Sequence, residues 1–279
     1  MNTLLASQIW LTILAAYAVF YGFRIYTRQA YSTWEIVLYL PAYLLGRLLW
    51  RVQFTNDPPP EMRSGAVLAP NHRSSVDPMF IQLAAKRRVH WMVAKEYCSL
   101  PVLRLVLKSL QVIPTNRTGT DINSTKLAMH YTRRGGLVGM FPEGRINFTM
   151  APLLPIRAGA AMVALKTGVP IIPLYVQGSP YRGSVLSPLL TPARVLVTFG
   201  KPIATCPDPG PSTSETQPKS SSIEGDTGPG ENSDRSGNSH HLAAEIMRQW
   251  GRTMVTLAGH PDAAFTVGSP RKRITQPAE

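Results

Sequence analysis

The fold of this chain is decided by residues 66–78, which read Ala-Val-Leu-Ala-Pro-Asn-His-Arg-Ser-Ser-Val-Asp-Pro. A short apolar run stops at Pro70, a polar loop follows, and Asp77-Pro78 opens an amphipathic run. Asp is favoured where a helix begins, and Pro fits the first helical turn. The stretch therefore predicts a strand, a tight loop and a helix. His72 and Asp77 would share the crevice between strand and helix, where open α/β sheets bind ligands.

The pairing of His72 with Asp77 suggests acid–base chemistry. An unperturbed histidine titrates at about pH 6.5, so its ring can take a proton from a substrate hydroxyl near neutrality. A carboxylate on the other ring nitrogen would fix the tautomer and stabilise the imidazolium. The alternative is that Asp77 only begins a helix and His72 is an ordinary loop residue.

Short apolar runs alternate with segments of helical spacing after residue 60, which predicts an α/β fold with a mainly parallel sheet flanked by helices. The strands are expected near 66–69, 89–94, 111–114, 137–141, 170–176 and 194–199. The helices are expected near 78–87, 99–109, 121–134 and 157–167.

Residues 1–55 are expected to form a two-helix membrane anchor. The run 3–23 has no charged residue, and a helix of that length spans roughly 31 Å, which predicts a transmembrane helix. Arg24 and Arg28 follow the run and none precedes it, which places the rest of the chain on the cytoplasmic face. A cleaved signal peptide is the alternative.

The second apolar segment, residues 34–50, contains a proline and two charges, which makes it a poor membrane span. A helix lying in the membrane interface fits better, and a buried core helix is the alternative. Its aromatic residues would then lie at headgroup depth: Trp34, Tyr39, Tyr43 and Trp50.

Composition divides the rest of the chain. Residues 56–205 are expected to form the α/β domain. Residues 206–239 are rich in Pro, Gly, Ser and acidic side chains, which predicts a disordered insertion. A C-terminal helix over 240–259 and a disordered tail over 260–279 complete the expected organisation.

Positive charge is concentrated in one part of the chain. Residues 24–201 carry 22 basic and 7 acidic side chains, whereas residues 202–279 carry 7 and 9. Such a surface suits anionic lipid or phosphorylated substrates. No nucleic-acid-binding motif accompanies the charge, so nucleic acid is not expected as a partner. The two cysteines are too few for a disulfide framework, and the His and acidic residues lack the spacing of a zinc site.

Three further stretches place candidate site residues at strand ends. Gln-Val-Ile-Pro-Thr-Asn over 111–116 runs into Arg117, and Phe-Pro over 141–142 runs into Glu143, Gly144 and Arg145. A third, Val-Pro-Ile-Ile-Pro-Leu over 169–174, reads as a buried strand. The carboxyl ends of parallel strands face one edge of a sheet, where two guanidinium groups can grip a phosphate.

In this order along the chain, the four stretches resemble the motifs of the glycerolipid acyltransferase family that acylates lysophosphatidic acid. Asn71, His72 and Asp77 match its first motif, Asn-His, four residues, Asp (HX4D). Arg117 matches the end of the second, and Phe141 to Gly144 match Phe-Pro-Glu-Gly-Thr-Arg. The strand 169–174 matches the fourth. The resemblance covers about residues 65–202, and one departure stands out: the threonine after Gly144 is missing.

The resemblance implies a membrane enzyme of phospholipid biosynthesis that moves an acyl group from acyl-CoA or acyl carrier protein to a lysophospholipid. His72 would be the general base and Asp77 its orienting acid. Arg117 and Arg145 would hold the acceptor phosphate, and the Glu143–Gly144 turn would bind the oxyanion. No cofactor or metal is implied. Alternatives are a family enzyme with another acceptor (glycerol-3-phosphate or a lyso-ornithine lipid), a phospholipid-dependent transacylase, or a non-catalytic protein that binds anionic lipid.

Overall fold

The structure is a computed structural model of the whole chain, and it describes residues 3–28, 33–99, 101–116, 121–181, 184, 186–205 and 231–268. The helices are α1 (Thr3–Arg28), α2 (Thr33–Leu44), α3 (Asp77–Ala85), α4 (Lys95–Cys98), α5 (Pro101–Ser109), α6 (Ile122–Arg133), α7 (Gly159–Thr167) and α8 (Glu231–Leu257). The strands are β1 (Gln53–Phe54), β2 (Ala66–Pro70), β3 (Val89–Ala94), β4 (Ile113–Thr115), β5 (Leu137–Gly139), β6 (Ile156–Arg157), β7 (Ile171–Gln177), β8 (Leu196–Phe199) and β9 (Val267–Gly268).

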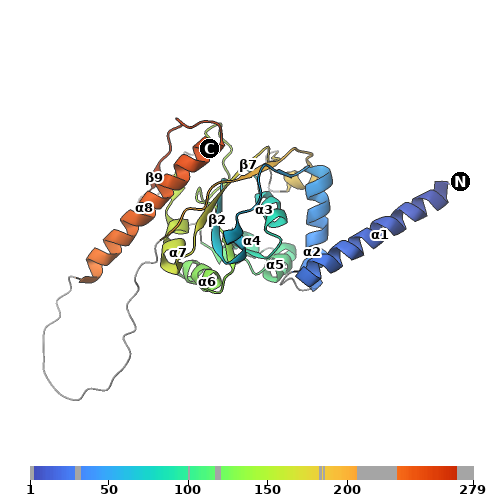
Figure 1. Ribbon diagram of the computed structural model, residues 1–279, viewed down its shortest axis with the longest axis horizontal. Helices are drawn as coiled ribbons and strands as arrows, with labels where there is room; N and C mark the ends of the chain where they lie inside the picture. The colour runs from blue at the N-terminus through green and yellow to red at the C-terminus, as the bar shows by residue number, and fades with distance from the viewer. Residues whose placement is uncertain are drawn as a thin grey trace, which may run out of the picture.

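Seven strands form one sheet in the order β1-β8-β7-β2-β5-β3-β4. Every neighbouring pair is parallel except β7 and β8, which run antiparallel. The predicted class, an α/β fold with a mainly parallel sheet flanked by helices, is therefore confirmed. β2 lies at the centre, between β7 and β5, and all five of its residues are buried. This placement carries the loop after Pro70 to the carboxyl edge of the sheet (Figure 1).

Alternation along β2 divides the core into two layers. Ala66 and Leu68 pack on one face of the sheet with residues of α3, whereas Val67 and Ala69 pack on the other with α6, α7 and α8. A period of two is what a strand covered by helices on both faces requires. Both layers are apolar, and together they hold the strand ends in fixed positions.

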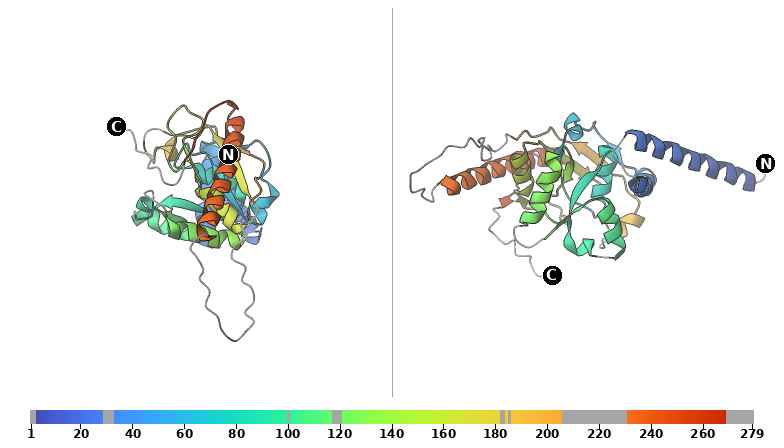
Figure 2. Two further views of the ribbon diagram at one scale, coloured as in Figure 1. Left: turned by 90° about the vertical axis from the view of Figure 1, so that its left-hand side faces the viewer. Right: turned by 90° about the horizontal axis from the view of Figure 1, so that it is seen from below.

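The N-terminal helices differ from the expected anchor. α1 is helical and extends away from the sheet on the side opposite α8 (Figures 1 and 2). In the described part of the chain, however, no helix combines the length and the apolar character that crossing a bilayer would require. The helix expected over 3–23 is present, and the transmembrane span predicted for it is not supported.

The second segment packs on the domain rather than presenting all of its aromatic residues to lipid. α2 continues into a short π-helical turn over 45–49, and Trp50 just after it is fully buried. The Trp50 indole donates to the carbonyl of Pro188 at 3.0 Å and meets the Phe80 ring edge-on. Tyr39 is also buried. The expectation of headgroup depth is wrong for Trp50 and Tyr39, because an aromatic helix face suits a protein core as well as an interface.

The C-terminal boundaries also differ from expectation. α8 begins at Glu231, so residues 231–239 of the predicted insertion are helical, and residues 206–230 lie outside the described residues. The expected tail contributes β9, which pairs in parallel with β6. Two-residue strands carry no periodicity, which is why the sequence did not predict them.

Candidate active site

The loop after β2 brings His72 and Asp77 together. Nδ1 of His72 lies 3.0 Å from Oδ2 of Asp77. Asp77 is fully buried, while the His72 side chain is 15% exposed. An ionised carboxylate has no hydrogen to donate, so its contact with the ring requires a hydrogen on the ring nitrogen. Nδ1 of His72 is therefore the protonated nitrogen and donates to Asp77. Nε2 is thereby left as the basic nitrogen. The predicted pairing of these two residues is seen in the structure.

Backbone groups of the same loop hold the carboxylate in place. The N–H groups of Arg73 and Ser74 each donate to Oδ2 of Asp77 at 2.7 Å. Asp77 is the first residue of α3, where the helix macrodipole also favours negative charge. The four-residue spacing in the motif therefore lets the chain fold back onto its own carboxylate. The ring of His72 stacks on Phe141, at 3.8 Å between ring centroids, which fixes its plane.

Glu143 lies beside the same loop, and its buried carboxylate accepts hydrogen bonds from backbone N–H groups. Its carboxylate accepts the N–H of His72 at 2.9 Å and the N–H of Leu154 at 2.8 Å. Only 3% of the residue is exposed. Burial raises the pKa of the Glu143 carboxyl above its ordinary value, and the two backbone donors oppose that rise. The predicted role in substrate binding is untested, and the observed contacts shape the loop that carries His72.

Gly144 and Arg145 form the exposed part of the turn after Glu143. Gly144 has a φ of +68° and donates its N–H to the carbonyl of Phe141 at 3.0 Å. That N–H is therefore used within the turn, which weakens its expected role as an oxyanion donor. Arg145 is exposed. A second guanidinium, that of Arg157, packs against Gly144 so closely that an added Cβ would lie 3.0 Å from its Cζ.

Arg117 lies outside the described residues, so its expected place at the site is not tested. The strand before it, β4, is at the far edge of the sheet, and β3 and β5 separate it from β2. Arg117 remains a predicted phosphate-binding residue. In the described parts of the chain, no three His, Cys, Asp or Glu side chains gather where they could hold a metal ion.

Sequence reasoning missed several residues that the structure places at the site. Arg73, inside the first motif, donates through its guanidinium to the carbonyls of Asn147, Thr149 and Ala151 at 3.2, 2.7 and 2.9 Å. Its place next to His72 was a signal that could have been used. Ser179 donates its hydroxyl to Oδ1 of Asp77 at 2.6 Å. No short motif links it to Asp77, because the two lie 102 positions apart in the sequence.

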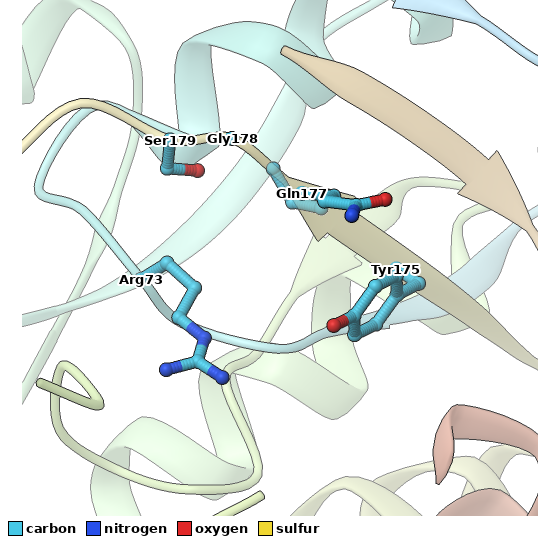
Figure 3. A pocket seen from close by; sticks show the side chains of 6 residues that line it. Arg73, Tyr175, Gln177, Gly178 and Ser179 are labelled. Atoms are coloured by element: carbon cyan, nitrogen blue, oxygen red, sulfur yellow. The ribbon is translucent and has the colours of Figure 1, made fainter. Parts of the chain in front are cut away.

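A cavity of about 270 Å³ opens on the β7 side of the loop (Figure 3). Its lining consists of Arg73, Tyr175, Val176, Gln177, Gly178 and Ser179. Burial raises the pKa of the Tyr175 hydroxyl, and the neighbouring Arg73 opposes the rise. Ser179 and Arg73 each bond to Asp77, so the cavity adjoins the His72 site. Its walls offer hydroxyl, amide and guanidinium groups to a polar ligand.

A buried carboxylate behind an imidazole, at the carboxyl edge of a parallel sheet, is an arrangement suited to general-base catalysis. Residues 51–177 match the sequence profile of the family described as Acyltransferase. This part of the chain is therefore similar to the acyltransferase family, as its motifs predicted.

The curated relatives are similar at low identity. A chloroplastic 1-acyl-sn-glycerol-3-phosphate acyltransferase of Brassica napus is 26% identical over 43% of this chain and 35% of its own length. An enzyme of the same name from Bacillus subtilis is 27% identical over 41% of this chain and 57% of its own length. Another from Haemophilus influenzae is 30% identical over 40% of this chain and 47% of its own length. The matched part of this chain thus spans only about a third to somewhat over half of these relatives.

A solved structure shares the fold. The crystal structure of the 1-acyl-sn-glycerophosphate (LPA) acyltransferase PlsC from Thermotoga maritima superposes with a TM-score of 0.50. The match covers 88% of this chain and 95% of that one, at 19% sequence identity. A likeness at this identity supports the α/β architecture with its N-terminal helices and leaves the substrate to other arguments.

Proposed function

We propose that this protein transfers a fatty acyl group from a thioester, acyl-CoA or acyl carrier protein, to the hydroxyl of a lysophospholipid. The preferred acceptor is 1-acyl-glycerol-3-phosphate, which gives phosphatidic acid. The observation that carries the proposal is the 3.0 Å contact between His72 Nδ1 and the buried Asp77 carboxylate. The family match over residues 51–177 and the names of the curated relatives support the same reaction.

The chemistry follows from the orientation of the His72 ring. Nδ1 donates to Asp77, so Nε2 takes the proton from the acceptor hydroxyl as its oxygen attacks the thioester carbonyl. Asp77 stabilises the imidazolium that forms. When the tetrahedral intermediate collapses, the carbon–sulfur bond breaks and the imidazolium returns the proton to the leaving thiolate. General-base catalysis is typically worth ~10² to 10⁴-fold, so His72 has to account for at least that factor.

The acceptor's phosphate is assigned to guanidinium groups near the turn at Gly144. Arg145 is exposed beside this glycine, and Arg157 packs against it. The family motif has a threonine between its glycine and its arginine, whereas Arg145 follows Gly144 directly. Arg157 therefore offers a second cation near the position that the motif's arginine would occupy. Arg117 is retained as a further candidate from its motif. Guanidinium groups bind phosphate oxygens in pairs, which favours a phosphorylated acceptor over a neutral one.

We further propose that the protein works at a membrane, with its catalytic domain on the cytoplasmic face, because its substrates are lipids. The described part of α1 exposes large apolar side chains over much of its surface, among them Trp10 (71% exposed) and Val19 (73% exposed). Apolar surface of this extent is typical of a lipid contact. Flotation with anionic lipid vesicles tests this point, and Trp10→Glu with Val19→Glu should reduce the bound fraction.

The test of the function uses the purified full chain in mixed micelles with radiolabelled acyl-CoA or acyl carrier protein. The acceptors are 1-acyl-glycerol-3-phosphate, glycerol-3-phosphate and a lyso-ornithine lipid, each analysed for labelled product. We expect product with the first acceptor and a loss of at least ~10²-fold in His72→Ala. Product with another acceptor alone would correct the substrate. Unchanged turnover in His72→Ala would refute the mechanism.

A further inference from the structure

Asp77 is held through both of its carboxylate oxygens, and the two oxygens have different partners. Oδ2 accepts the N–H groups of Arg73 and Ser74 and faces Nδ1 of His72. Oδ1 accepts the hydroxyl of Ser179 at 2.6 Å. Because Cγ, Oδ1 and Oδ2 lie in one plane, a hydrogen bond to Oδ1 restricts rotation of the carboxylate and with it the position of Oδ2 relative to the ring.

The fold delivers Ser179 to this position by a specific turn. Gly178 follows β7 with a φ of +77°, a conformation that L side chains rarely adopt. A Cβ at Gly178 would also collide with the carbonyl oxygen of Arg194. The glycine thus lets the chain turn back after β7 toward β2. Figure 3 shows Ser179 next to Gly178 at the wall of the cavity, across from Arg73.

We propose that Ser179 is a positioning residue for the acyl transfer proposed above, on which this inference rests. Its hydroxyl donates to Oδ1, which keeps the Asp77 carboxylate coplanar with the Nδ1–H of His72. This geometry holds the ring in the tautomer that leaves Nε2 basic. Without the hydroxyl, Oδ1 faces the cavity of about 270 Å³, where water replaces Ser179 and only the contacts of Oδ2 still orient the carboxylate.

The kinetic test compares Ser179→Ala with Ser179→Thr in the full chain. The alanine variant lacks the donor, and we expect kcat to fall about 10-fold or more while KM for both substrates changes little, because hydrogen bonds to charged groups are among the stronger ones. The threonine variant keeps the hydroxyl and should restore most of kcat. Ser64→Ala is the matched control: its exposed hydroxyl donates to the carbonyl of Glu61, just before the opposite end of β2.

A second measurement reports on the ring without any catalysis. In protein labelled with ¹⁵N in histidine, the chemical shifts of the two ring nitrogens report the tautomer populations, and His72→Gln identifies the signals of His72. We expect a single tautomer in the wild type and in Ser179→Thr, and a mixture in Ser179→Ala. Asp77→Asn provides the reference for a ring that has lost its carboxylate.

The outcomes separate this inference from the proposed function. Wild-type kcat in Ser179→Ala would overturn it, and so would an unchanged ring spectrum or a loss of kcat that Ser179→Thr fails to restore. If the wild type transfers no acyl group at all, the proposed function fails, and the spectra alone decide whether Ser179 controls the His72 ring. Thermal melting of each variant verifies that the comparison is made on folded protein.

Discussion

The side-chain amide of Asn71 forms two hydrogen bonds with the backbone of Val176. Nδ2 donates to the Val176 carbonyl at 2.9 Å, and Oδ1 accepts the Val176 N–H at 2.7 Å. Asn71 is fully buried. The pair extends the β2–β7 pairing by one step past Pro70, so the residue before His72 is tied to the strand that leads to Ser179. Asn71 therefore fixes the position of the His72 loop relative to the end of β7.

Replacing Asn71 by alanine should destabilise the protein and reduce turnover together. The N–H and C=O of Val176 would be left without these partners, at a cost of about 1–3 kcal/mol for each buried group. Urea denaturation measures the change in free energy of unfolding, and kcat is compared per folded molecule. A variant with normal kcat and normal stability would contradict the role assigned to this amide.

Asn56 provides a matched control for that prediction. Its side-chain amide forms the same pair of hydrogen bonds, with the backbone of Phe199 in β8, at 2.8 and 2.9 Å, but Asn56 is exposed. Water can replace an exposed amide, so Asn56→Ala should cost less stability. It should also leave kcat unchanged, because β7 separates β8 from the strand that carries His72.

The buried Glu143 predicts a measurable dependence of stability on pH. Its pKa is raised above the ordinary value of 4.5, mainly by burial. Between the unfolded and folded pKa values the folded state binds more protons, so the contribution of this group to the free energy of unfolding falls as pH rises through that interval. Glu143→Gln cannot titrate, and this part of the pH dependence should disappear.

The same substitution should also lower stability at pH values where Glu143 is ionised in the folded state, because both carboxylate oxygens then accept backbone N–H groups. A glutamine has one acceptor oxygen and one NH₂ group, so it cannot accept from both His72 and Leu154 through separate oxygens. We expect a loss of about 1–3 kcal/mol. Urea titrations between about pH 4 and pH 8 measure both effects. The exposed Glu245→Gln is the control, and identical pH profiles in wild type and Glu143→Gln would rule out the assignment.

Gly144 should resist substitution for two separable reasons. Its φ of +68° disfavours any side chain, and a Cβ would lie 3.0 Å from the guanidinium of Arg157. Gly259 has a similar φ of +78° with nothing within 4 Å of an added Cβ. Both alanine variants should therefore lose about 1 kcal/mol of stability from backbone strain. Only Gly144→Ala should also raise KM for a phosphorylated acceptor, because it displaces Arg157. If the two variants have equal KM values for this acceptor, Arg157 does not bind its phosphate.

Local patterns made the central fold predictable. The apolar run before Pro70 and the Asp-Pro that follows the loop lie within thirteen residues, so a strand, loop and helix could be assigned from neighbours alone. His72 and Asp77 belong to that same local unit, which is why their pairing could also be expected. The parallel sheet followed from the repeated alternation of strands and helices.

The remaining site residues depend on contacts between distant segments. Ser179 meets Asp77 only because β7 pairs with β2, and Arg157 reaches Gly144 only because the loop between them folds back. Periodicity carries no information about either contact. Trp50 shows the same limit: an aromatic residue in an apolar segment fits a membrane interface or a protein core equally well, and tertiary packing decided for the core.

Arg73 is predicted to hold the loop over residues 147–151 in place. Its guanidinium donates to three carbonyls of that loop, and Asn147 in turn donates its backbone N–H to the carbonyl of His72 at 2.7 Å. A lysine carries one ammonium point charge, which cannot span three carbonyls in this way. Arg73→Lys should therefore speed amide hydrogen exchange in residues 147–151, measured by mass spectrometry, and should lower kcat.

Arg87 provides a matched control for Arg73, because it makes the same kind of contacts at the opposite edge of the sheet. Its guanidinium also donates to three carbonyls, those of Met62, Arg63 and Gly135, at 3.4, 2.6 and 2.7 Å. Arg87→Lys removes an equivalent clamp at the amino ends of β2 and β5, so exchange should increase there while kcat stays near the wild-type value. If both lysine variants lower kcat equally, general loosening of the sheet explains the loss. If only Arg73→Lys does, the clamp on residues 147–151 is what keeps the His72 loop in its working geometry.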